Sequence, residues 1–287
     1  MTTHYRKVEV DGVEVFYREA GDPARPAFLL LHGFPASSFM FREFIELVAG
    51  QFHVIAPDYP GFGHSDAPPP AEFGYTFDHL TDIIERFTER LGLPKYGLYL
   101  QDFGGPVGFR LATRHPERVS FLHIQNANAY AEGLPDSFWT PARALWADPS
   151  TANREAIASA AMSGPALEWN YLHGVRDPAC VNPDNWLLQS ALLSRPGNMD
   201  AMVDLLYDYR TNLGQYPRWQ EYFRTCQPPA LITWGANDEI FPEAGAHPYR
   251  RDLPHAEVVI LDAGHFALED HADVIAGHLS RFTALAG

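Results

Sequence analysis

YGLYLQDFGGPVGFRLATRHP, residues 96–116, predicts a buried strand that turns sharply into a helix. The opening run, residues 96–100, is apolar without alternation, as is typical of strands buried on both faces of a sheet. QDFGG at 101–105 provides the turn, and the residues that follow are helical by composition. We therefore expect Asp102 to lie above the sheet at the positive end of a helix, where a carboxylate is both exposed and stabilised.

Further apolar runs of the same kind lie on both sides of this segment: AFLLL at 27–31, HVIAP at 53–57, SFLHI at 120–124, ALITW at 230–234 and EVVIL at 257–261. Amphipathic helical stretches separate several of them, and residues 78–92 are the clearest. This alternation predicts an α/β fold with a mostly parallel, doubly wound sheet. Residues 7–18 alternate instead around Asp11-Gly12, which predicts an antiparallel hairpin at the start.

The interval 130–225 breaks the alternation of strands and helices. It contains no convincing strand, but it holds several helical patches and five of the six tryptophans. An insertion of this kind would lie over the carboxyl edge of the sheet, where open α/β sheets bind ligands. We therefore expect a core formed by residues 1–129 and 226–287 and a helical cap domain formed by residues 130–225.

Composition excludes several classes of protein. The net charge of −15 argues against nucleic acid or an anionic membrane as a partner, because a phosphate backbone demands a basic surface. No run approaches the roughly 18 apolar residues of a membrane span. The start, MTTHYRKVEVDG, lacks the apolar stretch of a secretory signal, and Cys180 and Cys226 form no disulfide framework. We expect a cytoplasmic protein with a small-molecule substrate, and a homodimer stays open as its assembly.

Two further polar residues follow later strands, and their order along the chain indicates a catalytic arrangement. Asp238 lies in WGANDE after the strand predicted at 230–234, and His265 lies in AGHF after the strand at 257–261. The order along the chain is therefore Asp102, an acid and a histidine, which is the order of nucleophile, acid and base in α/β-hydrolases. Asp238 would orient His265, and His265 would act as the base.

An upstream loop completes this arrangement. HGFP at 32–35 follows the first buried strand, and a loop at this place supplies one backbone N–H to an oxyanion hole. We expect the N–H groups of Phe34 and Phe103 to hold the oxyanion that forms at Asp102. Ser37, Ser38 and Ser65 occupy no such turn, so a serine nucleophile is rejected.

HGFP, PDYPGFGHSD, QDFGG, WGANDE and DAGHF together resemble the α/β-hydrolase superfamily, in its branch with an aspartate nucleophile. That branch contains epoxide hydrolases and haloalkane dehalogenases. The resemblance covers about residues 5–130 and 226–285 and is weak in the cap. It implies a covalent alkyl ester on Asp102, hydrolysed by water that His265 activates, with no cofactor. The spacing of His265 and His271 around Glu269 is not that of a metal-binding pair on a helix, so we expect no metal.

The epoxide hydrolase resemblance leads. YDYRTN at 207–212 resembles the cap segment in which that family places an epoxide-activating tyrosine, which would make Tyr209 an acid. Ring opening needs such a donor because the epoxide oxygen leaves as an alkoxide. Epoxide hydrolases usually have a second tyrosine of this kind, for which Tyr130 and Tyr171 are candidates. A small to medium apolar epoxide is the expected substrate.

The alternatives are a haloalkane dehalogenase and a non-catalytic ligand-binding member of the superfold. Halide release needs two N–H donors near the nucleophile, and neither Phe34 nor Phe103 has one in its side chain. Trp139 or Trp146 of the cap could compensate. GGP at 104–106 stands where fluoroacetate dehalogenases carry arginines for the substrate carboxylate, which argues against a fluoroacetate substrate. For the substrate pocket the candidate residues are His32, Trp139, Trp146 and Tyr171, together with Phe138 and Trp169.

Overall fold

The computed structural model describes residues 2–286. These residues form one eight-stranded sheet in the order β1-β2-β4-β3-β5-β6-β7-β8. The strands are β1 (His4–Val10), β2 (Val13–Ala20), β3 (Ala27–Leu31), β4 (His53–Pro57), β5 (Tyr96–Gln101), β6 (Val119–Gln125), β7 (Ala230–Gly235) and β8 (Glu257–Leu261).

The predicted fold class is confirmed. β1 pairs antiparallel with β2, and β2 pairs antiparallel with β4, whereas every later pairing is parallel. Val10 faces Val13 across the turn at Asp11-Gly12, and both turn residues have positive φ, as a tight hairpin requires. β3, β5, β6 and β7 are buried along nearly their whole length, which explains why their sequences do not alternate.

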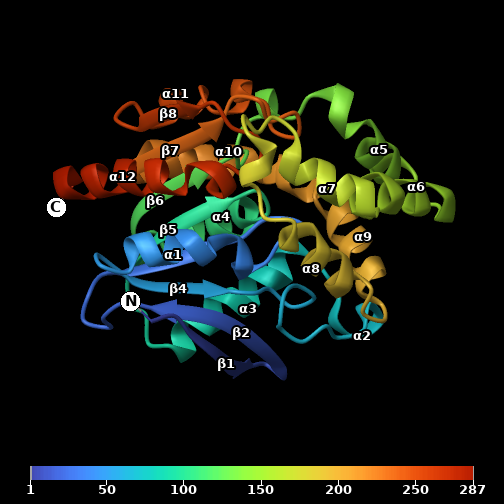
Figure 1. Cartoon of the computed structure of the whole chain (residues 1–287), viewed down its shortest axis with the longest axis horizontal. Coiled ribbons are helices and arrows are strands. Elements are labelled where there is room, and N and C mark those ends of the chain that lie inside the picture. Colours follow the sequence, from blue (N-terminus) through green and yellow to red (C-terminus); the bar gives the residue numbers. More distant parts are fainter. Residues whose placement is uncertain (1, 287) are drawn as a thin grey trace.

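Helices cover both faces of the sheet (Figure 1). α1 and α12 pack together on one face, and α3, α4 and α10 pack on the other. The helices are α1 (Arg42–Val48), α2 (Pro70–Phe73), α3 (Phe77–Arg90), α4 (Gly104–Arg114), α5 (Asp136–Ala147), α6 (Thr151–Met162), α7 (Gly164–Leu172), α8 (Asp184–Leu193), α9 (Asn198–Asp208), α10 (Arg210–Cys226), α11 (Tyr249–Asp252) and α12 (Leu268–Ala286).

The helix α3 follows the sequence pattern closely. Thr76 caps it by accepting a hydrogen bond from the backbone N–H of His79 at 3.1 Å. Its apolar stripe, which includes Leu80, Ile84 and Phe87, is buried against the sheet. The chain then leaves the helix at Gly92, whose φ of 66° suits a glycine.

Residues 126–229, all described, contain helices and no strand, and α5 to α9 lie beyond the carboxyl ends of the strands (Figure 1). α10 belongs with the core instead, although the sequence assigned it to the cap. Its Trp219 and Phe223 pack on Phe109 of α4, with ring centroids 5.2 and 5.4 Å apart. This aromatic face returns the chain to the sheet before β7 begins.

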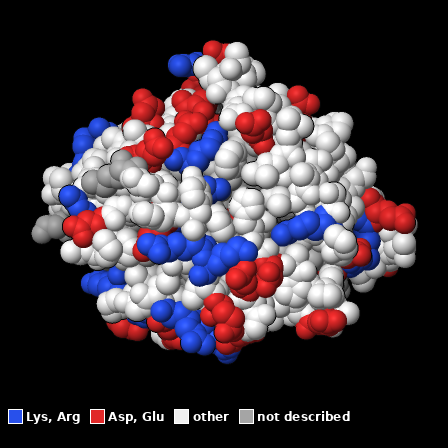
Figure 2. All heavy atoms as spheres, turned by 60° about the horizontal axis from the view of Figure 1, so that its bottom comes forward, with Lys and Arg blue, Asp and Glu red and all other residues white. Residues whose placement is uncertain are grey.

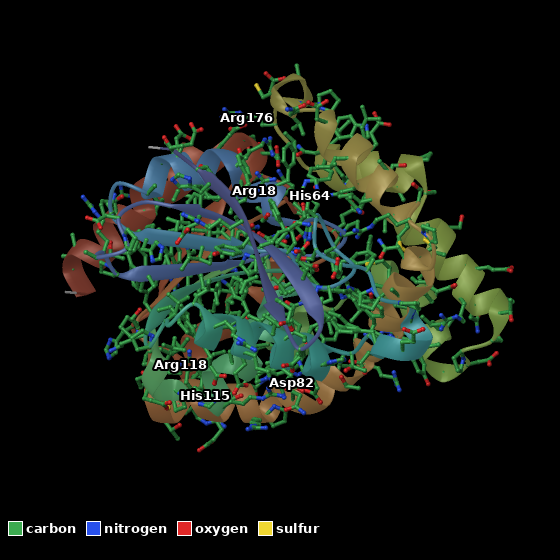
Figure 3. The ribbon with its side chains drawn as sticks, turned by 90° about the horizontal axis from the view of Figure 1, so that it is seen from below. Arg18, His64, Asp82, His115, Arg118 and Arg176 are labelled. Atoms are coloured by element: carbon green, nitrogen blue, oxygen red, sulfur yellow. The ribbon has the colours of Figure 1, made fainter. Side chains whose placement is uncertain are left out.

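The surface mixes charges of both signs. On the face drawn in Figure 2, acidic and basic side chains alternate with uncharged ones. In Figure 3, Asp82, His115 and Arg118 lie on the side of α3 and α4, away from the cap helices. Arg114, from the same region, donates to Asp82 at 2.7 Å, so the cationic groups there are partly paired. Among residues 2–286, no helix combines the length and apolarity that crossing a membrane requires.

Candidate active site

Asp102 lies in the turn between β5 and α4 with a φ of 49°. A non-glycine residue in this left-handed region costs about 1–2 kcal/mol, and such strain persists only where the surroundings hold it. The glycines of the turn allow the close packing. A side chain on Gly104 would collide with the backbone of Leu31, and one on Gly33 would collide with Asp102. The 5 % exposed Asp102 is thereby held at the end of the sheet.

The structure brings Asp102, Asp238 and His265 together. His265 Nδ1 donates to Asp238 Oδ2 at 2.7 Å, and its Nε2 lies 3.9 Å from Asp102 Oδ2. Burial disfavours the charged imidazole, but the carboxylates of Asp238 and Asp102 outweigh burial and raise the pKa of His265. The hydrogen bond at Nδ1 leaves the lone pair of a neutral ring on Nε2, on the side of Asp102.

Asp238 is fixed on both of its oxygens. Oδ1 accepts from the backbone N–H groups of Ile240 and Phe241 at 2.7 and 3.1 Å. Oδ2 accepts from Asn126 Nδ2 at 2.7 Å in addition to His265. The carboxylate is therefore fully hydrogen-bonded although it is buried, and it can hold the imidazole in one orientation.

The predicted oxyanion loop touches the predicted nucleophile. Phe34 N–H donates to Asp102 Oδ1 at 2.5 Å. Burial raises the pKa of Asp102 to about 6, while the charge of His265 and the N–H groups of Phe34 and Phe103 oppose that rise. Oδ1 thus faces the N–H groups of Phe34 and Phe103, and Oδ2 faces His265.

The raised pKa predicts that ionised Asp102 destabilises the folded protein. With a folded-state pKa of about 6 against the ordinary value of 3.8 for an aspartate, the protonated form is favoured on folding. The associated stability is full below the unfolded pKa and is lost as the pH rises through 6. At pH 8, Asp102→Asn should therefore raise the free energy of unfolding by about 3 kcal/mol, and at pH 4 by much less.

Urea unfolding of both proteins at the two pH values measures this difference. Asp273→Asn, at an exposed position on α12, is the matched control and should change stability little at either pH. A wild-type protein that is more stable than Asp102→Asn at pH 8 would contradict the raised pKa of Asp102.

A cavity of about 460 Å³ opens over Asp102 and His265, between the sheet and the cap. Its walls are mostly aromatic and aliphatic, and the helices α5, α6 and α7 contribute small residues. Such a shape suits an uncharged apolar molecule. The lining comprises Phe34, Asp102, Phe103, Phe138, Trp139, Pro141, Ala142, Ile157, Ala160, Ala161, Pro165, Ala166, Trp169, Asn170, Leu206, Ile240 and His265.

Three predicted pocket residues, His32, Tyr171 and Trp146, do not line the cavity. His32 is fully buried under the cavity floor, where Nδ1 bonds the carbonyl of Gly33 and Nε2 accepts from Tyr59 N–H. Burial lowers the pKa of His32 to about 4, so it holds the loop as a neutral ring. Tyr171 packs on the opposite layer, stacked 4.2 Å from Phe266, because its face of α7 turns toward α12.

The two cap tryptophans proposed as donors are already engaged. Trp139 lines the cavity, but its indole N–H donates to the carbonyl of Ile240 at 2.9 Å. Trp146 lies behind the wall and donates to the carbonyl of Leu206 at 2.8 Å. Neither indole therefore offers its N–H to a halide in this conformation.

Tyr209 lies in the cap wall rather than on the surface of the cavity. Its ring centroid is 4.8 Å from that of Trp139 and 5.8 Å from that of Phe103, two residues that line the cavity. Burial, together with the neighbouring Tyr216 and Asp102, raises the pKa of Tyr209 well above the usual value. Among residues 2–286, no hydrogen bond joins Tyr209 to Asp102. Tyr130, a candidate second tyrosine, donates to Asp252 at 2.7 Å instead.

Sequence reasoning missed three polar residues at the site. Asn126, at the end of β6, accepts the backbone N–H of Asp102 through its carbonyl and donates to Asp238. Gln101 lies beside the ring of His265, and Asn170 of α7 lines the cavity. The sequence did contain a signal for Asn126 and Gln101, namely their position at carboxyl strand ends. Gln101 is the last residue of β5, and Asn126 directly follows the neighbouring strand β6.

Comparison with known proteins shows the family. A model of the alpha/beta hydrolase fold matches residues 26–272, and the chain belongs to this family of hydrolases. It is 44 % identical over 278 residues to an uncharacterized hydrolase of Saccharomyces cerevisiae, YNR064C, covering 95 % of this chain and 94 % of that one.

Two further similarities are to proteins named as haloalkane dehalogenases, one in sequence and one in fold. Haloalkane dehalogenase 2 of Mycobacterium tuberculosis is 40 % identical over 101 residues, which is 35 % of each chain. The crystal structure of a haloalkane dehalogenase from Bradyrhizobium elkani superposes with a TM-score of 0.80 at 23 % identity, covering 99 % of this chain and 100 % of that one. The chain is thus an α/β-fold hydrolase.

Proposed function

We propose that this hydrolase opens small to medium apolar epoxides to diols through a covalent ester on Asp102. The observation that carries the proposal is the geometry around the Asp102 carboxylate. One oxygen accepts the Phe34 N–H, and the other faces His265, which Asp238 orients. Catalysis by a nucleophile, a base and an orienting acid needs this arrangement.

In the first stage, Asp102 Oδ2 attacks a ring carbon, and the carbon–oxygen bond of the epoxide breaks. The electron pair of that bond moves to the ring oxygen, which takes the hydroxyl proton of Tyr209 after a movement of the cap wall brings this hydroxyl into the cavity, and solvent later returns a proton to the tyrosine. The carboxylate must be ionised for this attack, so alkylation should slow as the pH falls below about 6, the pKa of Asp102.

In the second stage, His265 Nε2 takes a proton from water as the water oxygen bonds to the Asp102 carboxyl carbon. The N–H groups of Phe34 and Phe103 hold the resulting oxyanion. Collapse of this intermediate expels the diol oxygen, which takes the proton back from His265. Asp102 is left as the neutral acid, and it regains its carboxylate form by releasing its proton to solvent.

The donors around the cavity support an epoxide over a halide. Phe34 and Phe103 have hydrocarbon side chains, and the indole N–H groups of Trp139 and Trp146 are bonded to carbonyls. None of these four side chains therefore offers an N–H to a departing halide, and the other cap residues of the lining that carry a side-chain N–H are Trp169 and Asn170 of α7. An alkoxide needs a single proton, and Tyr209 borders the wall at Phe103.

Product analysis with styrene oxide and 1-bromobutane tests the substrate class. We expect diol formation with a kcat/KM at least about 100-fold above that of bromide release, because under this proposal Tyr209 supplies the single proton that ring opening needs. Tyr209→Phe should lower diol formation about 100-fold or more. Tyr207→Phe, on the same cap segment but partly exposed, is the control and should keep its activity. Faster bromide release in the wild type would identify a dehalogenase instead.

A further inference from the structure

Gln101 contacts the proposed base directly. It is the last residue of β5 and is completely buried, and its Nε2 lies 3.0 Å from Nε2 of His265. Its Oε1 is also buried, and within residues 2–286 it has no hydrogen-bond partner. The amide is closely packed against the backbone of Gly33, where even a Cβ atom would collide with Oε1.

The state of His265 fixes what this contact can be. Since Nδ1 donates to Asp238, a neutral ring has only a lone pair on Nε2, and Gln101 must donate its amide N–H to it. Once Nε2 has taken a proton from water, it can only donate, and an amide N–H can no longer face it. A half-turn about the terminal torsion of Gln101 exchanges N–H for Oε1 in the same place, and this torsion is soft.

We propose that Gln101 is a positioning residue for His265 whose amide follows the proton, donating to the neutral ring before water attack and accepting from the imidazolium afterwards. The buried carbonyl that lacks a partner in the resting site gains one when His265 becomes charged, so Gln101 strengthens the base during hydrolysis of the ester. This inference rests on the proposed function, because the ester on Asp102 is what His265 helps to hydrolyse.

Other charged groups also face His265. Asp102 from the turn after β5 and Asp238 from the loop after β7 both favour its charged form. Glu239 and His173, paired at 3.1 Å, line a small hollow next to the ring. Because the Gln101 variants leave all four residues in place, a change in the titration of His265 reports on the amide.

Two variants separate the two halves of the contact. Gln101→Met removes the amide at similar size. Both forms of the ring then lose a hydrogen bond, and the pKa of His265 should fall because the bond from the charged ring is the stronger of the two. Gln101→Glu supplies an acceptor that cannot donate, so the pKa of His265 should rise by at least one unit. Titration of His265 by 15N NMR in histidine-labelled protein measures both, and it needs no substrate.

Stopped-flow measurements with styrene oxide give the kinetic counterpart. In Gln101→Met, ester hydrolysis should slow about 10- to 100-fold, while alkylation of Asp102 should stay within about threefold of the wild type. In Gln101→Glu, the rate of ester hydrolysis should begin to fall at a higher pH than in the wild type, because His265 becomes protonated at a higher pH. This shift should match the shift in the NMR titration. A residue that only supports the fold would change stability without moving either quantity.

Gln125→Met is the matched control, because Gln125 is an equally buried amide that donates to the backbone carbonyl of His265 rather than to its ring. It should leave the titration of His265 unchanged. The proposal is overturned if both Gln101 variants titrate His265 as the wild type does. Failure of the proposed function would look different, since then no ester would form while the titration shifts persisted.

Discussion

A His265→Gln variant is expected to form the ester on Asp102 and then stop. Alkylation uses the carboxylate alone, whereas hydrolysis needs a base at the position of His265 Nε2, 3.9 Å from Asp102. Turnover should fall by about 10³-fold or more. Intact-protein mass spectrometry should show that the variant gains mass. An epoxide should add its full mass, whereas a haloalkane should add only its alkyl group because the halide has left.

His247→Gln is the control for this variant. His247 is exposed and pairs with Glu243, so the substitution should leave turnover intact and accumulate no adduct. If neither styrene oxide nor 1-bromobutane labels His265→Gln on the peptide containing Asp102, the non-catalytic ligand-binding alternative becomes the better account.

Asp238→Asn should lower turnover by about 10³- to 10⁴-fold. The two backbone N–H groups of Ile240 and Phe241 require an oxygen, which leaves the new amide N–H₂ facing His265 Nδ1. The imidazole must then accept at Nδ1 and carry its proton on Nε2, where it cannot act as a base. Hydrolysis should stall, while alkylation continues.

Asp262→Asn is the matched control for Asp238→Asn, because Asp262 is an exposed acid that accepts from Asn237 at the neighbouring strand end. It should turn over like the wild type. Rapid hydrolysis of the ester in Asp238→Asn would mean that another group orients His265.

The sheet could be predicted because its signals are local. The unalternating runs around residues 27–31 and 96–100 are buried on both faces, and the turn at Asp102 needs glycines that the sequence displays. Asp238 and His265 could be placed for the same reason, since parallel strands bring their carboxyl ends to one edge.

The cap could not be predicted in this detail because its aromatic residues are alike in sequence and differ only in tertiary contacts. Trp139 and Trp146 lie on one helix, yet only the first lines the cavity, and both indoles find backbone carbonyls far along the chain. Tyr171 turns toward α12, and His32 lies under the loop that it supports.

The fate of oxygen in a single turnover tests the central claim, that Asp102 is the nucleophile. Excess enzyme is mixed with styrene oxide in water enriched in ¹⁸O, and the diol and the peptide containing Asp102 are analysed by mass spectrometry. We predict an unlabelled diol and one ¹⁸O atom in Asp102, because water attacks the carboxyl carbon of the ester and the diol takes its new oxygen from Asp102. A labelled diol with an unlabelled Asp102 would mean that water attacks the epoxide directly, and it would contradict this account.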